Sequence, residues 1–157
     1  MTKTISVSVV IAYLLGILAL IAQMGYALLF GSLLPSNEYN LLVESILIAG
    51  AGGVLYCLRG VYLNYCVRKN WDSDWMVWYL IRPVASLICG GVSFLFLKAG
   101  LLVLEAKKET DATNLGFFAL AFIAGLNVDK FIMKIEELAK ATWGIEKSRS
   151  AGENDNH

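Results

Sequence analysis

Few side chains in this chain could take part in catalysis or metal binding. The single histidine, His157, is the last residue, so neither a histidine base nor a histidine metal cluster is expected. Cys57, Cys66 and Cys89 form no Cys-x-x-Cys pair, and we interpret them as small apolar packing residues. The chain also has no glycine-rich phosphate loop and no nucleophile elbow. We therefore predict no catalytic residue, no metal site and no cofactor.

Arg59 and Arg82 stand out because each lies inside an otherwise apolar segment. A charge within a bilayer is unfavourable, but the long stem of an arginine can reach the headgroups. Two interpretations remain open. Both arginines could hold lipid phosphates within a belt of tyrosine and tryptophan side chains, or they could line a vestibule or an anionic ligand site. Together with Arg68 and Lys69 they form the predicted cytoplasmic rim.

Long apolar segments would position these side chains. The first has no charged residue between Lys3 and Glu38, and a bilayer core about 30 Å thick needs roughly 20 apolar residues of helix. The chain is 57% hydrophobic and 17% charged, with 13 basic and 13 acidic residues, so no net charge favours nucleic acid. Four transmembrane helices are predicted at about residues 6–30, 44–66, 76–98 and 112–130. Residues 1–147 would form one all-α membrane domain, and residues 148–157 a disordered tail.

The basic residues orient this predicted bundle, since Lys and Arg gather on the cytoplasmic side of membrane proteins. If both termini are cytoplasmic, all 13 basic residues except Lys98, Lys107 and Lys108 lie inside. We therefore predict an N-in, C-in protein of the bacterial inner membrane. The first apolar segment is too long for the core of a cleaved signal peptide, so we expect it to remain as an anchor.

Pairs of small residues four positions apart recur in every predicted span. They are Ala12 and Gly16, Ala49 and Gly53, Ser86 and Gly90, and Ala121 and Gly125. Small residues let helix backbones approach closely in a membrane. The pairs could therefore pack helices within or between subunits, or the glycine-rich second and third spans could form a hinge or line a pore.

The fourth span is predicted to continue beyond the membrane. Apolar or small residues recur at spacings of four and three, and we call this row the seam. The seam consists of Phe117, Ala121, Ala124, Val128, Phe131, Ile135, Leu138, Thr142 and Ile145. Because the pattern crosses the membrane boundary without a proline, we expect one long helix with a cytosolic part at residues 130–147. The stripe from Phe131 to Ile145 would lie on headgroups, associate with other copies or bind a different protein.

Three stretches resemble those of small bacterial inner-membrane proteins: Trp78 to Pro83, Gly90 with Gly91, and Phe117 to Leu126. In size, number of spans and orientation, the chain also resembles the membrane subunit of the Kiwa phage-defence system. This resemblance implies a homo-oligomeric membrane sensor or anchor that acts with a cytosolic partner in antiviral defence. The partner, and not this chain, would contact nucleic acid. No functional residue is carried over from the resemblance.

The predicted function is thus non-enzymatic: a self-associating membrane protein that couples the bilayer to a cytosolic partner protein. The alternative is a small oligomeric ion channel or pore-forming effector, with the second and third spans around the conduit. Deleting residues 134–157 would distinguish the two hypotheses. The deletion should abolish partner capture if the protein couples the bilayer to a partner, and it should leave ion flux intact if the protein is a channel.

Overall fold

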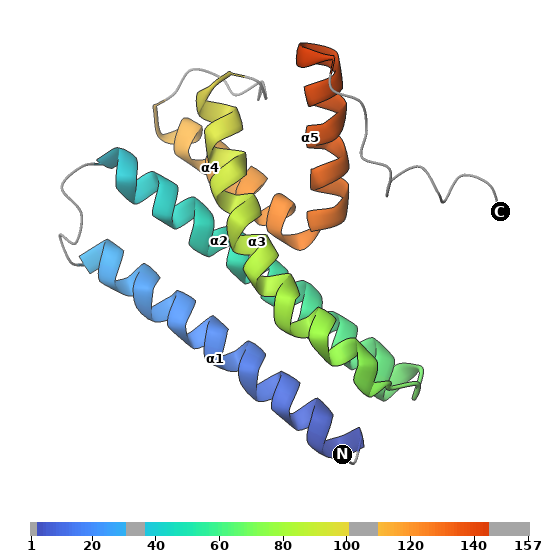
Figure 1. Cartoon of the computed structure of the whole chain (residues 1–157). Helices are drawn as coiled ribbons and strands as arrows, with labels where there is room; N and C mark the ends of the chain where they lie inside the picture. Colours follow the sequence, from blue (N-terminus) through green and yellow to red (C-terminus); the bar gives the residue numbers. More distant parts are fainter. Residues whose placement is uncertain (1–2, 31–36, 101–109, 145–157) are drawn as a thin grey trace.

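The computed structural model describes residues 3–30, 37–100 and 110–144, and within these ranges every regular element is helical (Figure 1). The α-helices are α1 (Lys3–Phe30), α2 (Asn37–Val61), α3 (Met76–Lys98), α4 (Thr110–Leu126) and α5 (Val128–Trp143). A six-residue π-helix, η1 (Tyr62–Val67), continues α2, and a 3₁₀ turn, η2 (Ser73–Trp75), leads into α3. The predicted all-α fold is confirmed.

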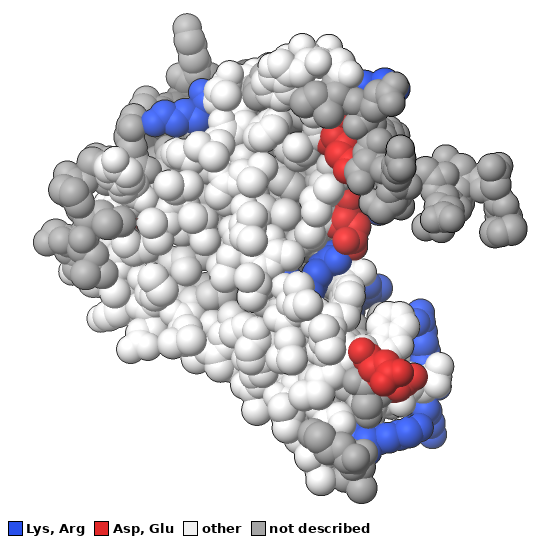
Figure 2. All heavy atoms as spheres, viewed as in Figure 1, with Lys and Arg blue, Asp and Glu red and all other residues white. Residues whose placement is uncertain are grey.

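Three of these helices are long and apolar enough to cross a membrane: α1, α2 together with η1, and α3. They contain the predicted spans 6–30, 44–66 and 76–98. The α4–α5 pair passes the same test only as a bent pair, which would bring the number to four. Charged side chains gather at the ends of the molecule and along the flank where α5 lies, and they leave a broad uncharged face between (Figure 2). This distribution is consistent with a helical membrane protein.

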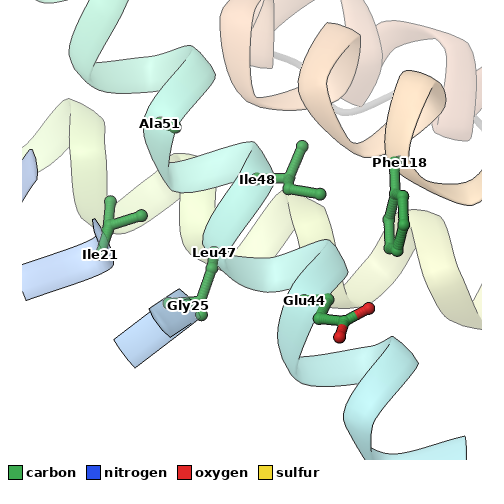
Figure 3. Close-up of a pocket in the computed structure, with 7 residues that line it drawn as sticks. All are labelled: Ile21, Gly25, Glu44, Leu47, Ile48, Ala51 and Phe118. Atoms are coloured by element: carbon green, nitrogen blue, oxygen red, sulfur yellow. The ribbon is translucent and has the colours of Figure 1, made fainter. Parts of the chain in front are cut away.

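Helices α1, α2 and α3 run in alternating directions, so α2 ends where α3 begins (Figure 1). We call this the arginine end, because Arg59, Arg68 and Lys69 lie there. The core of the bundle lies towards this end. Its buried members are Val7, Val10, Leu14, Val54, Cys57, Val61, Trp71 and Tyr79. Away from the arginine end, a groove of about 280 Å³ opens between α1, α2 and α4 (Figure 3). Glu44 is the one charged residue among the described residues that line this groove, which is otherwise apolar. Helix α1 therefore contacts the bundle mainly through the first half of the helix, which supplies Val7, Val10 and Leu14 to the core.

The predicted continuous fourth helix is wrong. Helix α4 ends at Leu126, α5 begins at Val128, and the two are bent by 112°. Asn127 between them has φ −126° and ψ 58°, outside the helical region. With the bend, seam residues on both sides of the break are buried against the same helix. Ala124 of α4 and Val128 of α5 both pack with Cys89 of α3. This shared apolar contact stabilises the bent form.

After the break α5 turns back along α3 and does not extend beyond the arginine end (Figure 1). Two hollows between the helices show the direction of α5. Ile132, near the start of α5, lines one hollow with Arg82 of α3, and Ile135, further along α5, lines the other with Val92, further along α3. Helix α5 therefore runs in the same direction as α3. The extension predicted at residues 130–147 is helical from Val128 to Trp143, but it lies against the bundle and is not continuous with α4. Ile145 and residues 148–157 lie outside the described ranges.

Candidate functional site

An ion pair fastens α5 to α3 close to the break. Arg82 lies in the second turn of α3 and Asp129 in the first turn of α5, with Arg82 Nη1 2.6 Å from Asp129 Oδ2. The Arg82 side chain is only 5% exposed, whereas that of Asp129 is 75% exposed. The guanidinium carbon of Arg82 also lies 4.8 Å from the ring centroid of Tyr56 and 5.3 Å from that of Trp78. Ring faces attract a cation at such distances, so aromatic side chains and one carboxylate together hold the buried charge.

The ion pair depends on the bend. A buried arginine without a counter-charge is strongly disfavoured, and Asp129 supplies the opposite charge from the far side of the break. The two residues meet because α5 begins at Val128 and turns back at once. Arg82 Nε is buried without a hydrogen-bond partner among the described residues. The ion pair between Arg82 and Asp129 therefore holds the start of α5 against α3, and we call it the latch. The Nε–H group of Arg82 remains available as a hydrogen-bond donor.

Ser86, one turn beyond Arg82, joins α3 to the end of α4. Its Oγ is buried and lies 2.9 Å from the carbonyl oxygens of both Arg82 and Gly125, so the hydroxyl can donate to either. In a continuous helix the carbonyl of Gly125 would accept from the amide four residues later, that of Asp129. The bend at Asn127 ends this helical pattern, and Ser86 offers a donor at the same place. The break is thus supported by hydrogen bonding from the neighbouring helix.

Five of the six predicted packing residues meet where α2, α3 and α4 approach most closely. A Cβ on Gly90 would lie 2.6 Å from the Cβ of Ala49, and one on Gly125 would lie 2.7 Å from the Cα of Ala49. A Cβ on Gly53 would collide with Ser86. The sixth residue, Ala121, is fully buried. These glycines lie between helices of one chain, which favours the packing interpretation over a pore lining.

The first predicted pair, Ala12 and Gly16, is not part of this crossing. No atom lies within 4 Å of a Cβ built on Gly16. That face of α1 is uncovered in the described chain and is free to meet lipid or another copy.

The predicted cytoplasmic rim is divided by the fold. Arg82 is buried in its ion pair, whereas Arg59, Arg68 and Lys69 are exposed at the arginine end. In the predicted interaction stripe, Phe131 and Ile135 are half-buried and line a groove of about 370 Å³ against α3. Leu138 is half-buried and Thr142 is exposed. The stripe is therefore partly used within the chain, and its far end is open.

Sequence reasoning missed the partner of Arg82. The predicted span 112–130 has Asp129 at its edge, and no local pattern connects this carboxylate with Arg82. The available indication was that a buried arginine needs a carboxylate. Asp129 is the sole Asp or Glu between residues 112 and 130.

Substituting Asn127 by alanine is expected to weaken the bend. Alanine favours helical dihedral angles by about 0.5 kcal/mol over asparagine, which corresponds to roughly a twofold shift towards a straight α4–α5 helix. Spin labels at Leu95 and Met133, both exposed, would report the shift as a longer distance component in pulsed electron resonance, in a background lacking the native cysteines. An unchanged distance distribution would show that Asn127 does not set the bend.

The chemistry available to this arrangement is electrostatic. The described residues contain no cluster of three or more His, Cys, Asp or Glu side chains placed to hold a metal ion. Comparisons of this chain with protein-family models, with curated proteins and with solved structures give no match. No relative therefore supplies a function for the latch.

Proposed function

We propose that this protein is a non-enzymatic, self-associating membrane protein that couples the state of the bilayer to a cytosolic partner through α5. A single observation carries the proposal: an amphipathic helix follows a one-residue break and is held against the bundle by an apolar contact and by an ion pair to the buried Arg82. We call α5 docked while it lies against α3, and released when it leaves that groove.

The outer face of docked α5 makes its position sensitive to the surroundings. Lys130, Lys134 and Glu137 are exposed on it. Each charge placed among acyl chains costs about 2.5–3.5 kcal/mol on translocon-based scales. Docked α5 therefore needs water, headgroups or another copy of the chain on its outer side. A change in what covers this face changes the balance between docked and released α5.

Released α5 has a short path to the membrane surface. Arg82, which marks the level of the break, is six residues from Met76 at the start of α3, about 9 Å along the helix. A pivot about Asn127 would bring α5 to the arginine end and open its stripe of Phe131, Ile135 and Leu138 to a partner. The positive-inside rule supports a cytoplasmic arginine end in a bacterial inner membrane, with both termini inside when α5 is released. The resemblance to the Kiwa membrane subunit supports antiviral defence as the setting.

A channel is the second candidate function, and the charged outer face of docked α5 favours it. A hollow of about 560 Å³ between α5 and the arginine end is lined by Arg82 and Asp129, and Figure 2 shows the surface indented on this side. In a ring of copies, docked α5 helices facing the centre would place their charges in a water-filled conduit.

Locking α5 against α3 separates the two functions. Phe131 packs on the cluster that contains Cys89, so a cysteine at position 131 can be joined to Cys89 by a short bifunctional reagent in a C57A/C66A background. We expect the cross-linked protein to remain folded and to lose the cytosolic partner that co-purifies with the uncross-linked protein from its native host. The partner is identified by mass spectrometry of the tagged complex.

The matched control carries its new cysteine at Met133, which is exposed on α5 and does not belong to the cluster around Cys89. The same reagent should leave its partner binding unchanged. Partner capture by fully cross-linked protein would contradict release of α5. Ion flux through liposomes that contain only the purified, cross-linked chain would instead establish the channel.

A further inference from the structure

The π-helix η1 reshapes the surface at the arginine end. Its wide turns run from Tyr62 to Val67, and such segments often mark functional sites. Within it, Asn64 Nδ2 donates to Tyr79 Oη at 3.0 Å, while Arg68 Nη1 donates to Asn64 Oδ1 at 3.4 Å. Tyr79 is only 1% exposed and packs on Trp71 with ring centroids 5.4 Å apart. A buried tyrosine therefore orients the guanidinium of Arg68 through one amide.

A pocket of about 300 Å³ lies beside this hydrogen-bonded chain, between the end of α2, η1 and the start of α3. Arg59 and Arg68 both line it, with Trp75 and Trp78 forming apolar walls. The absence of a side chain at Gly60 lets the Tyr79 ring pack close to the backbone of α2, because a Cβ on Gly60 would lie 3.2 Å from Tyr79 Oη. The lining contains two cations and no carboxylate. Among the described residues, Arg59 has no ion-pair partner.

This combination suits a phosphate group. Guanidinium groups donate paired hydrogen bonds to phosphate oxygens, and two arginines line this pocket, whose described lining residues include no carboxylate. The nearest acid by lining is Asp72, in the adjoining pocket that shares Arg68, and no ion pair joins it to Arg68 among the described residues. Tryptophan side chains prefer the headgroup region of a bilayer, so the two tryptophans of the pocket wall favour a position at the depth of phospholipid phosphates. The two indole rings also offer apolar surface to the glycerol part of such a ligand.

We propose that this pocket binds the phosphate group of an anionic phospholipid or of a soluble phosphate ester. The assignment goes beyond the coupling role of α5 and does not depend on it, because neither Asp129 nor any other α5 residue lines the pocket. Partner capture by fully cross-linked protein would contradict the coupling role of α5 and leave the phosphate site standing, whereas absence of phosphate binding would leave the Arg82–Asp129 ion pair and its role standing.

The test titrates the full-length chain in nanodiscs with bromine-labelled phosphatidylglycerol and, separately, bromine-labelled phosphatidylcholine. Bound bromine quenches tryptophan fluorescence, and Trp75 and Trp78 lie in the pocket walls. We expect tenfold or stronger preference for phosphatidylglycerol, and a tenfold or greater loss of that affinity in R59Q and in R68Q. The matched control is K69Q, which removes one positive charge from the same segment but from outside the pocket lining, and which should change affinity less than twofold.

A second arm measures glycerol 3-phosphate binding to protein in phosphatidylcholine nanodiscs by calorimetry. Binding in either arm that R59Q and R68Q abolish and K69Q retains supports the phosphate site, and the arm that binds identifies the source. Equal losses in R59Q, R68Q and K69Q would overturn it in favour of diffuse surface charge. Absence of phosphate-dependent binding in both arms would overturn it outright.

Discussion

Gly125→Ala is expected to destabilise the bundle by about 3 kcal/mol, at the upper end of the range for overpacking. The new Cβ would lie 2.7 Å from the Cα of Ala49, and a backbone atom of a long helix cannot move aside cheaply. Helices α2 and α4 would have to separate. The separation would also strain the contact between Ser86 and the Gly125 carbonyl, which holds the end of α4 against α3. Thermal unfolding in detergent, followed by circular dichroism, would show the loss as a lower Tm.

Gly16→Ala is the matched control for this substitution. It adds the same methyl group to a glycine within a long helix, but no atom lies within 4 Å of the new Cβ. Alanine also has the higher helix propensity, by about 1 kcal/mol in water, so the control should be neutral or stabilising. Equal Tm values for the two variants would contradict the close crossing of α2 and α4.

Asp129→Asn is expected to shift α5 from docked to released by about 2 kcal/mol, roughly thirtyfold in population. Removing one member of a buried ion pair costs about 3–5 kcal/mol, and we expect less here because water reaches the 75% exposed Asp129. Arg82 is left with its charge buried and its aromatic contacts unchanged. The labelled pair Leu95 and Met133 would report the released fraction.

Two further variants separate the latch from a general charge effect. The double variant R82M/D129N should recover much of the docked population, because it removes the buried charge together with its partner. Lys134→Gln breaks the exposed Lys134–Glu137 pair, whose side chains are 66% and 51% exposed, and should move the balance by less than about 0.5 kcal/mol. A D129N response no larger than that of K134Q would show that the ion pair does not hold α5.

Helices α1, α2 and α3 could be predicted because each contains a stretch long and apolar enough to cross a membrane. The small-residue pairs on α2, α3 and α4 were also informative, since Gly53, Gly90 and Gly125 lie where a Cβ would not fit. Both the helices and the small-residue pairs could be predicted from residues close together in the sequence. The same type of pair at Ala12 and Gly16 shows the limit, because spacing alone does not say which helix faces it.

The break at Asn127 could not be predicted from the seam. Heptad spacing records which residues share a face of a helix, and it is satisfied equally by a straight helix and by two helices that bury the same face around a bend. The choice depends on contacts distant in sequence: Cys89 with Val128, Ser86 with Gly125, and Arg82 with Asp129. Likewise, no local pattern distinguished η1 from an ordinary end of α2.

The groove that receives α5 has a mechanical consequence. If the protein works as proposed above, a docked α5 adds the cross-section of a helix, about 10 Å wide, to the area that the protein occupies in the plane of the bilayer. On release this area is returned to the lipid. Lateral stretching of the membrane should therefore favour the docked form and lateral compression the released one. The bent pair would in this way convert surface pressure into the position of one helix.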